Sequence, residues 1–164
     1  MISNSVNEKM ISFKELEKKI FKYVCELGCE ITRSILEAYD DAVAVKRDKQ
    51  KYRNKGKRAT CIKTVYGSVK YQRRIYGTIT ENGEKAYVYL LDAEMRMDKI
   101  GMISSNLAEK IAMTVTESPY RVTAETISST SGQSISASGV WNVMQRLGEK
   151  ISEEEKYAVK QMHA

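Results

Sequence analysis

A long apolar stripe near the N-terminus constrains the fold more than any other feature. Between Ser12 and Val45, apolar side chains recur in steps of three and four, the spacing of one face of a single α-helix. Ser12 can cap this helix, with Glu15 completing a capping box. The stripe can be a coiled-coil seam or lie on the core of its own domain. Its members are Phe13, Leu16, Ile20, Val24, Leu27, Ile31, Ile35, Ala38, Ala42 and Val45.

A basic stretch follows this helix. Between Lys46 and Arg74 twelve Lys and Arg face one Asp, a local charge of +11, whereas the other residues sum to −5. Its first part, to Arg58, is polar and predicts a linker. Its second part alternates apolar and polar residues around Gly67-Ser68, which is typical of a β-hairpin. The predicted phosphate contacts are Arg47, Lys55, Lys57, Arg58, Lys63, Lys70, Arg73 and Arg74.

A solvated charge run is the plainer interpretation of such a stretch. Here nearly all the charges are positive and the stretch includes an ordered hairpin, which favours contact with nucleic acid instead. Further along, the β-rich runs Tyr76 to Ile79 and Ala86 to Leu91 flank Asn82-Gly83, a strong turn signal. We therefore expect a three-stranded antiparallel meander over Thr60 to Leu91.

From residue 104 onward the pattern becomes helical. Ser118-Pro119 separates two helices, Gly132 follows the second, and Ser136 can cap a third. This order outlines a helix-turn-helix, with a plain helical hairpin as the alternative. We expect Trp141 to be a core or interface anchor. Asn and Gln suit adenine edges and Arg suits guanine, so the predicted base contacts are Ser138, Asn142, Gln145 and Arg146.

The cysteines argue against two classes of protein. Three thiols without framework spacing are not a secreted disulfide scaffold. Cys25 and Cys29 would share a helix face, but Cys61 and His163 are far away in sequence, and a zinc site usually takes four ligands. We expect buried core thiols, no metal and no cofactor.

The chain also lacks the marks of a membrane or secreted protein. No apolar run approaches the roughly 20 residues that span a bilayer, and the N-terminus does not have the pattern of a secretory signal. We expect a cytoplasmic, nucleoid-associated protein of α+β class. Its predicted parts are a long helix with a basic linker (1–58), an antiparallel β-meander (59–98) and a helical helix-turn-helix region (99–164).

Two blocks carry a resemblance to a known family. They read KTVYGSVKYQRRIY (Lys63 to Tyr76) and SPYRVTAETISSTSGQSISASGVWNVMQRLG (Ser118 to Gly148), on either side of YLLDAEMRM (Tyr89 to Met97). In this order, over roughly Lys46 to Ile151, the chain resembles the N-terminal half of bacterial insertion-sequence transposases of the ISLre type. These proteins are often filed as an uncharacterised protein family.

The resemblance implies a DNA-binding front half that finds the terminal repeats of the element. It also implies a later ribonuclease-H-like domain whose acidic residues hold divalent metal and cut DNA. The chain ends at Ala164, before such a domain would begin, so no catalytic residue is assigned and no activity is expected from this chain alone. A truncated or frameshifted gene would explain the end.

Two other functions stay open. One is an adaptor without a nucleic-acid role, which oligomerises through Phe13 to Val45. The other is an RNA-binding protein that uses Tyr66, Tyr71 and Tyr76 as stacking platforms. The expected partners are double-stranded DNA and a second copy of the chain, paired through the Phe13 to Val45 helix. No membrane partner is expected.

Overall fold

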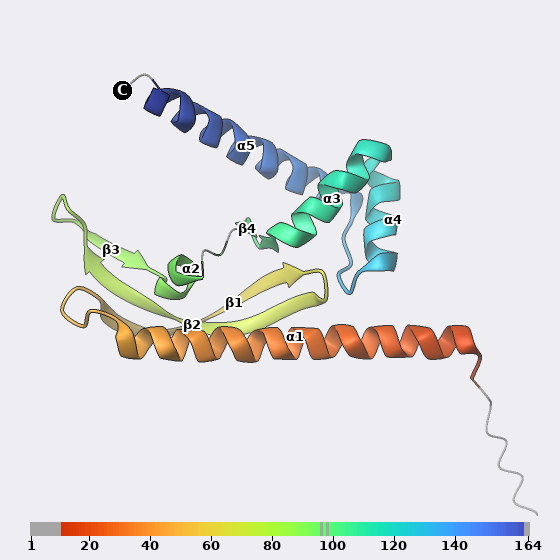
Figure 1. The fold of residues 1–164 in the computed structure, drawn as a ribbon, viewed down its shortest axis with the longest axis horizontal. Coiled ribbons are helices and arrows are strands. Elements are labelled where there is room, and N and C mark those ends of the chain that lie inside the picture. The colour runs from red at the N-terminus through yellow and green to blue at the C-terminus, as the bar shows by residue number, and fades with distance from the viewer. Residues whose placement is uncertain (1–10, 96, 98, 163–164) are drawn as a thin grey trace, which may run out of the picture.

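The protein has a long helix on one side of a β-hairpin and a group of helices on the other (Figure 1). The computed structural model describes residues 11–95, 97 and 99–162, and the predicted α+β class is confirmed. The elements are α1 (Phe13–Lys46), β1 (Arg53–Thr64), β2 (Gly67–Ile79), β3 (Lys85–Val88), α2 (Leu90–Glu94), β4 (Lys99–Ile100), β5 (Ile103–Ser104), α3 (Ser105–Glu117), α4 (Tyr120–Thr130) and α5 (Ala137–Met162).

Helix α1 begins with the predicted capping box. The Ser12 hydroxyl accepts a hydrogen bond from the Glu15 amide (3.3 Å), and the Glu15 carboxylate accepts one from the Ser12 amide (3.1 Å). The side of α1 that packs on the hairpin carries Cys25, Leu36 and Asp40. At about 100° per residue, the predicted apolar stripe lies on the other side of the helix. The stripe therefore does not form the core of this chain.

The hairpin differs from its prediction at two places. Thr64 pairs with Gly67, so the turn is Val65-Tyr66, two residues before the predicted Gly67-Ser68. Gly67 has φ 139°, a conformation that side-chain-bearing residues rarely adopt. The predicted linker up to Arg58 is wrong, because β1 begins at Arg53. Strand pairing to β2, across a bulge after Asn54, orders this polar segment although its side chains stay exposed.

The predicted three-stranded antiparallel meander is confirmed, since β2 pairs with β1 on one side and with β3 on the other. Two very short strands extend it. In the part of the chain that the structure describes, the sheet order is β3-β2-β1-β5-β4. The third strand ends at Val88 rather than Leu91, because Leu90–Glu94 forms the short helix α2, which buries Leu91.

Helix α1 covers the edge of β2 that β3 leaves unpaired. The Gln72 amide donates to the Glu37 carboxylate (2.9 Å), and the Arg74 amide donates to the Asp40 carboxylate (2.9 Å). These bonds satisfy backbone donors that an open strand edge would present to another chain. A hydrophobic cluster secures the contact and comprises Leu36, Ile62, Val69, Tyr71 and Leu91.

Helices α3, α4 and α5 share a second core. Leu107 and Ile111 of α3, Ile127 of α4 and Val140 of α5 are each 2% exposed or less. Apolar side chains of the hairpin tip and of β4–β5 pack against this cluster as well. The region predicted to start at residue 99 therefore contributes two strands to the sheet before its helices begin.

Candidate nucleic-acid interface

The first half of α5 presents the residues that were predicted to contact bases. Its start is fixed by Ser136, whose hydroxyl accepts a hydrogen bond from the Gly139 amide (3.1 Å), so the predicted cap is confirmed. The inner side of the helix buries Val140 and Val143 against α3 and α4. All four predicted base contacts are exposed, namely Ser138, Asn142, Gln145 and Arg146.

Two large side chains lie at the margins of this face. Trp141 was expected in a core or interface, but it is 49% exposed and stands beside Asn142 on α5. The guanidinium of Arg146 lies against Gly101 in the turn between β4 and β5, where an added Cβ would collide with it. Ser138, Asn142 and Gln145 therefore form the open centre of the face, with Arg146 at its rim.

The connection between α4 and α5 docks on the tip of the hairpin. The Gly132 amide donates to the Val65 carbonyl (2.9 Å), and the Ser68 hydroxyl donates to the Gln133 side-chain oxygen (2.9 Å). An added Cβ at Gly132 would lie 1.9 Å from the Tyr66 carbonyl oxygen. Glycine is required here for close approach of two backbones, and the contact fixes α5 relative to the hairpin.

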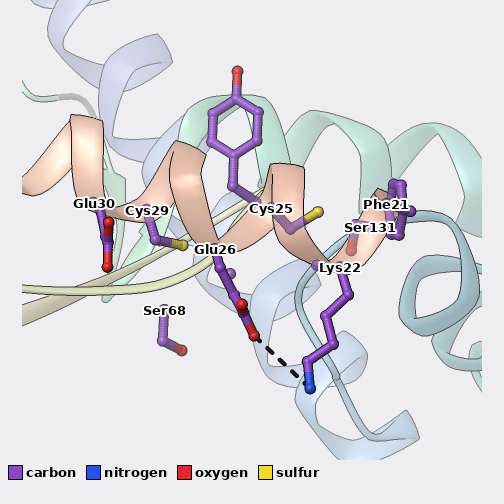
Figure 2. A pocket seen from close by; sticks show the side chains of 11 residues that line it. Phe21, Lys22, Cys25, Glu26, Cys29, Glu30, Ser68 and Ser131 are labelled. Carbon is purple, nitrogen blue, oxygen red and sulfur yellow. Dashed lines mark ion pairs between the residues drawn. The ribbon is translucent and has the colours of Figure 1, made fainter. Parts of the chain in front are cut away.

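The same junction includes α1. An added Cβ at Gly28 would lie 3.0 Å from the Tyr66 ring, so the glycine in the middle of α1 makes room for the hairpin tip. Figure 2 shows the hollow of about 560 Å³ at this junction, lined by α1 residues from Phe21 to Glu30 together with Ser68 and Ser131. Lys22 and Glu26, one turn apart on α1, form an ion pair at its edge (3.8 Å).

The Cys29 thiol at this junction is unsuited to nucleophilic chemistry. Burial raises the pKa of the Cys29 thiol, and the neighbouring Cys25, Cys61 and Glu26 raise it further. A thiol is a weak nucleophile and metal ligand while it stays protonated. Within the described residues, no cluster of three or more His, Cys, Asp or Glu side chains is arranged to hold a metal ion. His163 lies outside the described residues.

Two of the predicted phosphate contacts are held inside the protein. The Arg73 guanidinium is 10% exposed, pairs with Asp92 and lies 3.7 Å from the centroid of the Tyr89 ring. The Arg74 guanidinium binds the Asp40 and Asp41 carboxylates, each at 2.6 Å. Their acidic partners are remote in sequence, so the basic stretch alone could not indicate these ion pairs. Both guanidiniums are engaged in ion pairs within the chain, and little of either side chain is exposed.

Arg74 and Asp41 each favour the charged form of the other. Burial pulls the pKa of the Arg74 guanidinium down, but its hydrogen bonds to Asp41 and Asp40 outweigh that effect and raise it. The hydrogen bond from Arg74 lowers the pKa of the Asp41 carboxyl, and the charge of Lys57, 3.6 Å away, adds to this. The nearby Asp41 carboxylate thus partly balances the positive charge of Lys57.

Arg47 is also engaged within the chain. Its Nε donates to the Tyr52 carbonyl (3.3 Å), and its guanidinium lies 5.4 Å from the centroid of the Tyr76 ring. The other predicted phosphate contacts are exposed, namely Lys55, Arg58, Lys63 and Lys70. Lys63 and Lys70 lie near the hairpin tip, whereas Lys55 lies at the opposite end of the hairpin.

The structure adds a basic groove at the end of the hairpin remote from α5. This groove, about 420 Å³, lies where the start of β1, the end of β2 and β3 meet. Four cationic side chains line it, together with the exposed Tyr87: Lys51, Arg53, Lys55 and Lys85. Lys85 was missed because it lies outside the basic stretch, and strand pairing alone brings it there.

The predicted stacking platform for RNA is not available. Tyr71 is 2% exposed and Tyr76 is fully buried, so neither ring can stack on a base. Burial raises the pKa of both phenols. Tyr66 is 47% exposed, but one side of its ring packs on Gly28.

Comparison with protein families identifies the family of this chain. Among the described residues, no helix is both long enough and apolar enough to cross a membrane. No curated protein and no solved structure matches the chain significantly. The sequence pattern of an uncharacterised protein family, UPF0236, matches residues 6–163. Because this match covers nearly the whole sequence, the chain belongs to the uncharacterised protein family UPF0236.

Proposed function

We propose that this chain binds duplex DNA and is the end-recognition part of an insertion-sequence transposase. The observation that carries the proposal is the face of α5, where Asn142 and Gln145 are exposed while Val140 and Val143 anchor the opposite side. A capped helix supported by two others and presenting amides to water has the form of a recognition helix in the major groove.

The basic groove supports the same function from the other end of the hairpin. From Arg53 to Thr64, β1 spans at most about 36 Å at roughly 3.3 Å per residue. One turn of DNA is roughly 34 Å long. A duplex lying along the hairpin would meet the α5 face and the groove about one turn apart. In this proposal α5 reads bases, and the groove with Arg58 supplies affinity through phosphates.

The assignment to a transposase rests on the resemblance of the two sequence blocks to the ISLre type. The cutting of DNA is assigned to no residue of this chain. Burial of Tyr71 and Tyr76 weighs against the RNA-binding alternative, which needs exposed rings.

The experiment compares two amide truncations on the same helix. Duplexes enriched from a random pool by the wild-type chain are titrated beside scrambled duplexes of equal composition. Asn142→Ala should weaken binding to the enriched duplex by about 1–3 kcal/mol and leave scrambled DNA nearly unaffected. Gln161→Ala removes an exposed amide from the last turn of α5 and should change neither. An equal loss on both duplexes would make Asn142 a backbone contact, and failure to enrich any duplex would refute specific recognition.

A further inference from the structure

We propose that α1 pairs antiparallel with α1 of a second copy of this chain. This interaction surface is separate from the proposed DNA-binding surfaces and consists of different residues. The hairpin packs on one side of α1, and in Figure 1 no described element covers the other side. That side carries the apolar stripe. Its large members are all 40% to 78% exposed: Phe13, Leu16, Ile20, Val24, Leu27, Ile31, Ile35 and Val45.

The spacing of the stripe is regular. Steps of three, four and four residues occur twice and are followed by three, four and three, so that Phe13, Val24 and Ile35 occupy equivalent positions eleven residues apart. An eleven-residue repeat has about 3.67 residues per turn, close to the 3.6 of a straight helix. The stripe therefore stays on one side of α1 along its length and can meet another straight helix throughout. Scattered surface apolar residues would not show such a repeat.

The stripe is large enough for a stable interface. Eight large apolar side chains at about half exposure offer on the order of 600 Å² per helix. Tyr23 and Tyr39 at its margins, 65% and 52% exposed, bring the total to the roughly 800 Å² per partner of a standard interface. Monomeric proteins rarely expose an apolar patch of this size.

Side-chain size indicates the antiparallel orientation. The N-terminal third of the stripe carries Phe13, Leu16 and Ile20, whereas its C-terminal third carries the smaller Ala38, Ala42 and Val45. Antiparallel pairing places large side chains opposite small ones and keeps the two helix axes evenly spaced. Parallel pairing would place large against large at one end and alanine against alanine at the other, which leaves a gap.

The first test is the mass of the full chain in solution. Sedimentation equilibrium from 1 to 100 µM should give twice the 18.7 kDa monomer mass. Ile31→Asp, at the middle of the stripe, should halve the mass at all these concentrations and keep the helical circular dichroism, because Ile31 is remote from the hairpin. Arg33→Asp introduces the same side chain two residues away on another exposed side of α1 and should stay dimeric. A monomeric wild type, or a dimeric Ile31→Asp, would overturn the proposal.

The second test addresses orientation and does not depend on a variant that dissociates. With the stripe centred near Cys29, Phe13 of one copy lies opposite Val45 of the other. Under mild copper–phenanthroline oxidation, the double variant Phe13→Cys/Val45→Cys should form disulfide-linked dimers, and Phe13→Cys alone should not exceed wild type. Efficient linkage of Phe13→Cys alone would overturn the antiparallel arrangement. A chain that binds DNA as a monomer would refute this pairing and leave the proposed function standing.

Discussion

Replacement of Gly132 by Ala should separate the helical group from the hairpin. The new Cβ would lie 1.9 Å from the Tyr66 carbonyl oxygen and 2.5 Å from its carbonyl carbon. Both atoms are backbone, so the two segments must move apart rather than a side chain rotate. The movement also breaks the hydrogen bond from the Gly132 amide to the Val65 carbonyl.

The magnitude follows from these contacts. Overpacking of a tight contact costs about 1–3 kcal/mol, and a lost buried hydrogen bond costs about 1 kcal/mol. We therefore expect Gly132→Ala to lower the free energy of unfolding by about 3 kcal/mol. Urea denaturation followed by circular dichroism measures this value.

Two other glycines serve as controls for the change in stability. Gly148 lies in α5 with nothing within 4 Å of an added Cβ, so Gly148→Ala should be neutral or stabilise by up to about 1 kcal/mol through helix propensity. At Gly28 an added Cβ would meet the Tyr66 ring at 3.0 Å, and Gly28→Ala should fall between the two. If Gly132→Ala stays within about 0.5 kcal/mol of wild type, the hairpin tip does not dock on the α4–α5 connection.

Three further predictions concern the buried carboxylate Asp40, the buried phenol Tyr76 and the cleavage of DNA. Asp40→Asn should cost about 3 kcal/mol, because it leaves the Arg74 guanidinium without its buried partner, while Asp41→Asn at the exposed partner should cost under about 1 kcal/mol in the same urea titration. Tyr76→Phe should be neutral or stabilise by about 1 kcal/mol, since the buried hydroxyl has no hydrogen-bond partner among the described residues. Burial raises the pKa of Tyr76, so its contribution to stability is complete below the unfolded-state pKa near 10 and is lost as the pH rises through its folded-state pKa; Tyr76→Phe should flatten this alkaline loss. Purified chain incubated with magnesium or manganese should leave supercoiled plasmid intact, and nicking that co-purifies with the chain would contradict this expectation.

The sequence predicted most of the local structure. The capping box at Ser12, the Asn82-Gly83 turn and the Ser136 cap each act through neighbours within a few residues, and all three appear in the structure. The two-residue strands β4 and β5 were not predicted, because so short a segment carries no periodicity.

Contacts between residues far apart in the sequence could not be predicted from the sequence alone. Periodicity identified the apolar side of α1 but could not show that the hairpin would pack on another side, around Leu36 and Asp40. Arg73 and Arg74 are adjacent cations in a basic stretch, which is why they were predicted to contact phosphates. Their acidic partners Asp92 and Asp40 are brought to them only by the fold. The basic groove depends likewise on strand pairing that sets Lys85 beside Arg53 and Lys55.

The salt dependence of DNA affinity tests the central claim most directly. If about six of the exposed cations around the groove and along β1 touch phosphates, the logarithm of the association constant should fall with a slope of about −5 against the logarithm of salt concentration. Fluorescence anisotropy with a labelled 20-bp duplex should then show roughly a thousandfold loss of affinity between 50 and 200 mM salt. Charge reversal of Arg53 and Lys55 should make the slope shallower by about two, because each phosphate contact contributes about one unit. An affinity that does not change with salt, or a slope unchanged by these substitutions, would contradict the account.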